Sequence, residues 1–147
     1  MSTRCYQCMN EYNESYDMCP YCGCEKDISA KEMYFLYPGT VILDRYEIGI
    51  SVGSGGFGIT YKAWDRALSK VVCVKEFYPV GLVNRIPGEQ EVIIYSGSRQ
   101  REFANGKTRF LEEAQNMAKF NTHPHIVNVY DFFECNRTAY IVMEFLD

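Results

Sequence analysis

The amino-acid sequence predicts an α+β fold, in which a five-stranded antiparallel sheet carries one main helix and follows a small cysteine-rich segment. Three observations support this prediction. Alternating apolar residues flank a Gly-x-Gly-x-x-Gly run at residues 53–58, which is typical of strands joined by a glycine turn. Residues 109–120 are helical in composition. Two Cys-x-x-Cys pairs lie within the first 24 residues.

Length and composition limit the number of domains and the class of protein that this chain can be. At 147 residues the chain can hold one ordinary domain, or a very small domain and a modest one. Hydrophobic residues make up 47% of the chain and aromatic residues 15%, which is enough for a packed core and argues against general disorder. No apolar run is long enough to span a bilayer, and residues 1–8 lack the apolar stretch of a secretory signal. We therefore expect a cytoplasmic protein with no membrane segment in this chain.

The distribution of charged residues indicates whether nucleic acid is a suitable partner. Residues 1–30 hold 2 basic and 5 acidic side chains, a net charge of −3, and the remainder holds 13 basic and 14 acidic side chains, a net charge of −1. Nucleic-acid binding depends on Lys and Arg side chains that displace counterions from phosphates. Neither part offers a basic stripe, so nucleic acid is not expected as a partner.

The cysteine spacing indicates a metal site. Cys5 and Cys8 form one Cys-x-x-Cys pair and Cys19 and Cys22 form another, ten residues further on. Two thiolates from each of two tight turns can complete a tetrahedron around Zn²⁺. In a chain without a signal peptide this spacing favours metal ligation over disulfides. Cys24 is a fifth nearby sulfur that could replace Cys22, but the two-residue spacing favours Cys22.

Residues 1–28 are therefore predicted to form a small zinc ribbon with four cysteine ligands. Gly23, which follows the last ligand, can adopt the positive φ that lets backbone amides face the sulfur atoms. A segment this short cannot bury enough apolar surface to fold alone, so the metal would supply the folding free energy. Residues 29–42 are predicted to be a connector, whose apolar run at 34–39 docks onto the next domain.

The remaining chain begins with three expected strands at residues 46–52, 59–64 and 71–74, the last of which ends at Lys75. The glycine run between the first two could belong to a dinucleotide-binding fold, but that motif must open into a helix, whereas a second strand follows here. A Walker loop needs Lys and then Ser or Thr after its last glycine, and residues 59–60 are Ile and Thr. The context therefore favours a glycine-rich hairpin, which can close over a triphosphate.

These residues resemble those of eukaryotic-like bacterial serine/threonine protein kinases. The run at residues 55–61 is similar to the glycine loop of that family, and residues 72–75, Val-Cys-Val-Lys, are similar to its Val-Ala-Ile-Lys motif, with Cys73 in place of alanine. The resemblance covers residues 43–147 and implies the N-terminal lobe (N-lobe) of a kinase. It further implies that Lys75 holds the α- and β-phosphates of ATP.

The family also requires a glutamate on the following helix that orients the lysine. Glu112 shares a helical stripe with polar residues, whereas Glu113 shares one with Phe110 and Met117, the face expected to pack inward. Periodicity and the family pattern agree on Glu113 as the partner of Lys75.

The end of the chain resembles the kinase hinge. Residues 123–127, His-Pro-His-Ile-Val, are similar to the turn between the helix and the fourth strand, and both histidines are interpreted as structural. The last two strands are expected at 127–134 and 138–145. The resemblance makes Met143 the gatekeeper and assigns the adenine hydrogen bonds to residues 144–146. The full set implied to bind ATP is Gly53, Gly55, Gly56, Gly58, Thr60, Cys73, Lys75, Met143, Glu144 and Leu146.

One feature departs from the family pattern. Lys75 and Glu113 are 38 positions apart, which is long for this lobe. Residues 79–105 are therefore predicted to form an insertion with a short strand at 92–95 and an extra turn of helix.

The sequence lacks the His-Arg-Asp and Asp-Phe-Gly motifs, which supply the catalytic base and a Mg²⁺ ligand in this family. We expect no catalytic residue in this chain and no activity from it alone, while the complete protein serine/threonine kinase would use ATP with Mg²⁺ and meet its protein substrate through a large lobe. An N-lobe without its large lobe exposes apolar surface, through which copies of this chain could self-associate. The alternative is a naturally short, non-catalytic module in which ribbon and lobe only bind partners.

Overall fold

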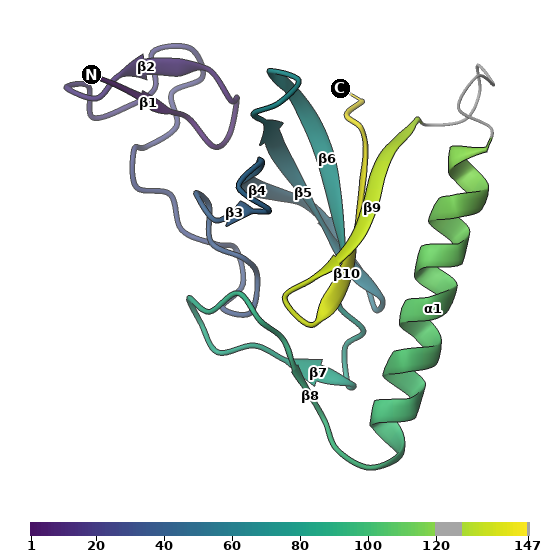
Figure 1. The fold of residues 1–147 in the computed structure, drawn as a ribbon. Coiled ribbons are helices and arrows are strands. Elements are labelled where there is room, and N and C mark those ends of the chain that lie inside the picture. Colours follow the sequence, from purple (N-terminus) through teal and green to yellow (C-terminus); the bar gives the residue numbers. More distant parts are fainter. Residues whose placement is uncertain (120–127, 147) are drawn as a thin grey trace.

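The computed structural model describes residues 1–119 and 128–146, and its central feature is an antiparallel sheet of six strands in the order β3-β4-β5-β6-β10-β9 (Figure 1). Two further two-stranded sheets, β1-β2 and β7-β8, lie outside it. The elements are β1 (Ser2–Arg4), β2 (Glu11–Asn13), β3 (Val41–Ile42), β4 (Tyr46–Ser54), β5 (Gly58–Asp65), β6 (Lys70–Phe77), β7 (Val83–Asn84), β8 (Ile93–Ile94), α1 (Ser98–Ala118), β9 (Val129–Cys135) and β10 (Thr138–Glu144).

The predicted antiparallel sheet with one main helix is confirmed, but the prediction of five strands was wrong. The sixth strand, β3, pairs with the start of β4, with Val41 opposite Glu47 and Ile42 opposite Tyr46. Two residues are too few to show the alternation that reveals a strand in a sequence.

The turn between β5 and β6 is held by Asp65, which is fully buried. Its carboxylate accepts hydrogen bonds from the Arg45 side chain at 2.9 Å and from the backbone N–H groups of Ala67 and Leu68 at 2.9 and 3.2 Å. Burial alone would raise the pKa of Asp65, but these hydrogen bonds outweigh it and hold the pKa below its usual value. The turn therefore fixes the register of the hairpin that carries Lys75.

The main helix is longer than predicted. It spans Ser98–Ala118, so it begins eleven residues before the expected start at residue 109, and the expected end at residue 120 lies outside the described residues. The added part contains Asn105 and Gly106, which are poor helix formers. Tertiary packing outweighs these propensities, because the buried side chain of Phe103 contacts Phe77 at a ring-centroid distance of 5.3 Å.

The two faces of the sheet bury different partners. Alternation along β10 sends Tyr140 and Val142 to one face and Ile141 to the other. The first face packs against the connector residues Phe35 and Leu36, and the second packs against α1 through Ala114. Figure 1 shows α1 and the connector on opposite sides of the sheet. No helix in the described residues is long and apolar enough to cross a membrane.

The predicted insertion holds a buried ion pair that the sequence did not suggest. Arg85 and Glu76, whose side chains have no exposed surface, form a two-point contact, with 3.1 Å between Arg85 Nη1 and Glu76 Oε1. Arg85 also donates to the backbone oxygens of Tyr34 in the connector, at 2.9 Å, and of Gln90 in the insertion, at 3.2 Å. The insertion therefore joins the connector to β6, the strand of Lys75.

Two tyrosines complete this network. Tyr140 donates to Glu76 Oε2 at 2.6 Å, and Tyr61 donates to Glu76 Oε1 at 3.1 Å. Burial, followed by the nearby Glu76 carboxylate, raises the pKa of both phenols well above the usual value, so both remain protonated donors. Every partner of the carboxylate is thus a donor, as a buried charge requires.

Candidate functional site: a glycine-loop cleft and a cysteine cluster

The glycine run forms the tip of the β4–β5 hairpin. The Gly55 N–H donates to the Gly58 carbonyl at 3.0 Å, which closes the tip. The tip also continues toward the insertion, since the Val80 N–H donates to the Gly56 carbonyl at 3.0 Å. A Cβ at position 58 would lie 2.8 Å from the Glu76 carbonyl and 3.6 Å from Lys75 Cε, so the close approach of these strands requires glycine there. At Gly53, Gly55 and Gly56 a Cβ would meet no atom within 4 Å.

The pairing of β6 places the other predicted residues beside the hairpin. Thr60 on β5 lies opposite Lys75, and Cys73 lies opposite Met143 on β10. Burial raises the pKa of the Cys73 thiol, so it remains protonated and acts as a small apolar side chain. The strands thus bring the glycine tip, the lysine and the predicted gatekeeper into neighbouring positions.

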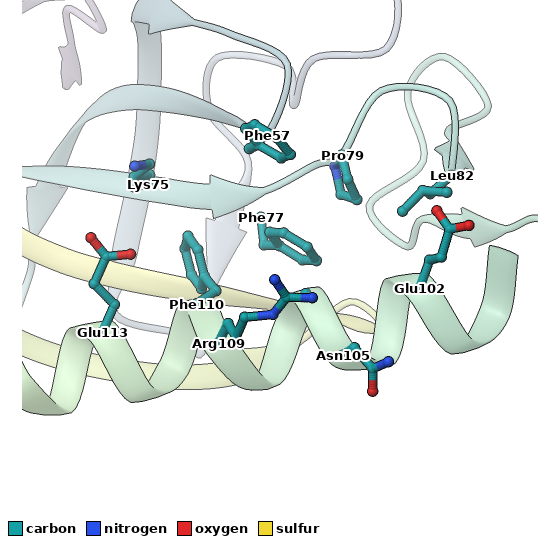
Figure 2. A pocket seen from close by; sticks show the side chains of 11 residues that line it. Phe57, Lys75, Phe77, Pro79, Leu82, Glu102, Asn105, Arg109, Phe110 and Glu113 are labelled. Carbon is teal, nitrogen blue, oxygen red and sulfur yellow. The ribbon is translucent and has the colours of Figure 1, made fainter.

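A cavity of about 480 Å³ opens between the hairpin and α1. Lys75 and Glu113 both line it, whereas Glu112 does not. Figure 2 shows the Glu113 carboxylate pointing from α1 toward the strand that carries Lys75. No ion pair within 4.0 Å joins these two side chains, both of which belong to the described part of the chain. The complete lining is Phe57, Lys75, Phe77, Pro79, Leu82, Glu102, Asn105, Gly106, Arg109, Phe110 and Glu113.

The predicted hinge begins at Glu144, the last residue of β10. The backbone N–H of Glu144 donates to the Asn128 carbonyl at 2.9 Å, so this donor is already engaged. Leu146 lies beyond the strand with 63% of its surface exposed. The predicted turn at residues 123–127, with its two histidines, lies outside the described residues.

The two Cys-x-x-Cys pairs come together in space. The sulfur atoms of Cys5, Cys8, Cys19 and Cys22 lie within 4.8 Å of one another. The Sγ–Sγ distance is 3.6 Å both between Cys5 and Cys22 and between Cys8 and Cys19. A tetrahedral ion with Zn–S bonds of about 2.3 Å separates neighbouring sulfurs by about 3.8 Å, so this donor set fits Zn²⁺. Cys24 is outside the cluster, and its thiol donates to the Glu25 carbonyl at 3.4 Å.

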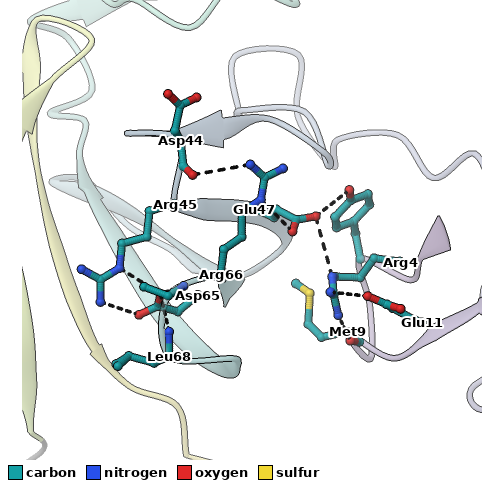
Figure 3. Close-up of polar contacts among 11 residues, drawn as sticks. Arg4, Met9, Glu11, Asp44, Arg45, Glu47, Asp65, Arg66 and Leu68 are labelled. Carbon is teal, nitrogen blue, oxygen red and sulfur yellow. Dashed lines mark hydrogen bonds and ion pairs between the residues drawn. The ribbon is translucent and has the colours of Figure 1, made fainter. Parts of the chain in front are cut away.

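The cysteine-rich segment is docked directly on β4, a contact that the sequence analysis missed. Glu47 accepts hydrogen bonds from the Tyr6 hydroxyl and the Arg66 side chain, both at 3.1 Å, and lies 3.7 Å from Arg4 Nε (Figure 3). The Ile50 N–H donates to the Tyr6 carbonyl at 3.0 Å, so the first cysteine turn supplies a hydrogen bond where the pairing of β4 with β5 is irregular. The first cysteine turn and the glycine hairpin therefore contact the same strand, β4.

Gly49 permits this docking. A Cβ at this position would lie 2.3 Å from Met9 Cε and 2.3 Å from the Tyr6 carbonyl oxygen. Met9 could move aside, but the Tyr6 carbonyl is backbone and would have to shift with its whole turn. The Gly49→Ala substitution should therefore destabilise the chain by about 1–3 kcal/mol, as overpacked sites do.

Limited proteolysis and chemical unfolding check the prediction for Gly49. We expect faster cleavage in residues 25–40 of Gly49→Ala, while Gly55→Ala, whose Cβ would meet no atom within 4 Å, should unfold like the original chain. Equal cleavage rates in all three proteins would contradict the assigned contact.

Comparisons with known proteins agree with this arrangement. Residues 46–147 match the family model of the protein kinase domain. The chain is 30% identical over 134 residues to the serine/threonine-protein kinase PknG of Mycolicibacterium smegmatis, covering 87% of this chain and 14% of that protein. It is 37% identical over 108 residues to PknB of Mycobacterium tuberculosis, covering 71% of this chain and 14% of that protein.

A solved structure has the same fold. The structure described as "PpkA-294 apo form" is 32% identical and superposes with a TM-score of 0.71, covering 76% of this chain and 39% of that one. The chain spans about a seventh of the length of the two curated relatives, each of which it covers to 14%. With its glycine hairpin, β6 lysine and helix glutamate around one cavity, and with a match to the family model from residue 46 onward, the chain belongs to the protein kinase domain family.

Proposed function

We propose that this chain is the ATP-binding N-lobe of a bacterial serine/threonine protein kinase, with a zinc ribbon at residues 1–28. The observation that carries the proposal is the shared cavity, in which Lys75 on β6 and Glu113 on α1 lie next to the glycine hairpin. A lysine beside glycine-rich backbone is suited to a polyphosphate, because the glycines offer amides without side-chain obstruction and the lysine offers positive charge.

Each residue has a proposed role toward ATP. The backbone at residues 53–58 would cover the triphosphate, Lys75 would bind its α- and β-phosphates, and Glu113 would orient the lysine. Cys73 and Met143 would border the adenine. Because the Glu144 N–H already donates to Asn128, Glu144 would contribute its carbonyl, and Leu146 its N–H. The same set includes Gly53, Gly55, Gly56, Gly58 and Thr60, which form or flank the hairpin tip.

In the complete enzyme this lobe would serve phosphoryl transfer from ATP to protein serine or threonine. That reaction also needs a base for the hydroxyl proton and ligands for Mg²⁺. Neither motif that supplies them in this family occurs in the sequence, so we assign no catalytic residue to this chain. We propose that the chain alone transfers no phosphate.

The proposed role of zinc is structural. Four cysteine thiolates would fill the tetrahedron, which leaves no position for a substrate or an activated water. The fit rests on the four sulfur atoms within 4.8 Å of one another. Docked on β4, the zinc ribbon would serve regulation or partner binding by the kinase.

Titration with the fluorescent analogue trinitrophenyl-ATP in Mg²⁺ tests the nucleotide site. Because half of the cleft would come from another lobe, we expect weak but saturable binding. Lys75→Met should lower the affinity at least about tenfold, since it removes a charge-assisted contact worth about 1.5–3 kcal/mol.

The matched control is Lys70→Met, at the exposed start of the same strand, which should bind like the original chain. Equal affinity in Lys75→Met and Lys70→Met would contradict the role given to Lys75. Phosphorylation of a generic protein substrate by the purified chain would contradict its proposed inactivity.

A further inference from the structure

A close contact joins α1 to the strand that carries Lys75. Gly106 lies inside the helix, where glycine is less favourable than alanine by about 1 kcal/mol. A Cβ at this position would lie 2.8 Å from Cζ of the Phe77 ring, and 3.6 and 3.7 Å from its two Cε atoms. The sequence therefore keeps an unfavourable helix residue at the point where an aromatic ring meets the helix backbone.

The Phe77 ring is enclosed at this point. Phe103 and Phe110 lie on either side of Gly106 along the helix, and each has its ring centroid 5.3 Å from that of Phe77. The two rings are tilted by 43° and 40° to the Phe77 ring. We call this arrangement of Phe77, Phe103, Gly106 and Phe110 the aromatic seat.

The aromatic seat lies close to the proposed lysine–glutamate pair. Phe77 follows Lys75 by two positions, which places both on one face of β6. Gly106 precedes Glu113 by seven positions, about two helical turns or about 10 Å along α1. Phe77, Gly106 and Glu113 line the same cavity as Lys75 (Figure 2). The distance between the Phe77 ring and the backbone of α1 at Gly106 thus affects the separation between α1 and β6 at the cavity.

We infer that Gly106 is a positioning residue: the missing side chain lets α1 approach Phe77 closely enough for Glu113 to engage Lys75 when nucleotide is bound. This inference rests on the proposed nucleotide site. In the structure the two side chains share the cavity without an ion pair, so the position of α1 relative to β6 affects whether the pair can form. At 2.8 Å from the Phe77 ring an added methyl group is too close to fit in place, so either the helix or the ring would have to move.

The Gly106→Ala substitution tests this inference by trinitrophenyl-ATP titration of the full 147-residue chain. We expect about a tenfold loss of affinity, the same loss as for Glu113→Gln, because both remove the charge-assisted contact of Glu113. The control is Asn116→Ala, at an exposed position of the same helix, which should leave the affinity unchanged. Unchanged affinity in Gly106→Ala would overturn the inference while leaving the nucleotide site intact.

A double-mutant cycle separates positioning from general damage to the fold. In the Gly106→Ala background, Glu113→Gln should cause no further loss, since the contact is already absent. A full further tenfold loss there would overturn the inference, because the Glu113 contact would then be independent of position 106.

A second pair of variants covers the case in which Gly106→Ala folds poorly. Phe77→Leu together with Gly106→Ala returns the space taken by the methyl group and should restore the affinity to within about twofold of the Phe77→Leu chain. Failure of this rescue in a folded double variant would count against the aromatic seat. If the original chain binds no nucleotide, the proposed function and this inference both fail. If the original chain binds nucleotide but the Gly106 variants do not behave as expected, only the inference fails.

Discussion

Substitution of Cys19 by serine should release zinc and unfold residues 1–28, while the six-stranded sheet remains folded. Structural zinc sites in small domains contribute about 10–16 kcal/mol of apparent binding free energy, which is folding free energy when the apo segment is unstructured. Between them β1 and β2 contribute only six strand residues, and Cys5, Tyr12, Cys19 and Cys24 are the buried residues of this segment's own cluster. The proposed metal would therefore be its main source of order.

Elemental analysis and amide-resolved NMR check the zinc prediction. We expect one zinc per chain, lost in Cys19→Ser together with the dispersed signals of residues 1–28. Cys24→Ser is the matched control, because Cys24 is buried nearby but outside the sulfur cluster, and it should retain one zinc. A metal-free original chain, or disulfides among the four cysteines, would contradict the assignment.

Replacement of Arg85 by methionine should destabilise the chain by about 3–5 kcal/mol, the range for removing one partner of a buried ion pair. Glu76 would keep its two tyrosine donors but lose the opposite charge, in a place where its side chain has no exposed surface. The connector and the insertion would also lose their common donor, since Arg85 bonds to the Tyr34 and Gln90 carbonyls. Unfolding in urea, followed by circular dichroism, measures the change.

Arg66→Met is the matched control for Arg85. Arg66 also pairs with a glutamate, Glu47, but 48% of its side chain is exposed. Exposed pairs contribute about 0–1 kcal/mol, so this variant should unfold nearly like the original chain. Equal destabilisation in the two variants would show that burial of Glu76 does not govern the effect. The combined Arg85→Met and Glu76→Gln variant should recover part of the lost stability, because the buried charge is then removed.

The local features of the site were predictable from the sequence. The glycine tip and the strands before and after it depend on alternation within a few residues, so residues 53–58 and Lys75 could be placed without a tertiary structure. Helical periodicity favoured Glu113 over Glu112, and of these two glutamates only Glu113 lines the cavity with Lys75 in the structure. The cysteine spacing likewise indicated which four sulfur atoms lie close together in the structure.

Features that depend on distant contacts were not predictable. The early start of α1 needs Phe103 to pack against Phe77, and Gly106 is unfavourable in a helix until that ring is present. The role of the insertion depends on Arg85 meeting Glu76 across nine positions, and both residues look like ordinary surface charges in the sequence. The docking of the cysteine turn on Gly49 is equally non-local. Periodicity reports which face of an element is apolar but not what packs against it.

The most direct test of the account is amide-resolved NMR of the 147-residue chain during titration with Mg²⁺ and ATP. If this is an ATP-binding N-lobe, the shifts should concentrate at residues 53–60, at Lys75 and at residues 143–146, and they should vanish in Lys75→Met but persist in Lys70→Met. Residues 1–28 should shift little, because their proposed role is to bind metal and none of them lines the cavity. Shifts confined to residues 1–28, or saturable binding that leaves residues 53–60 and Lys75 unperturbed, would contradict the account.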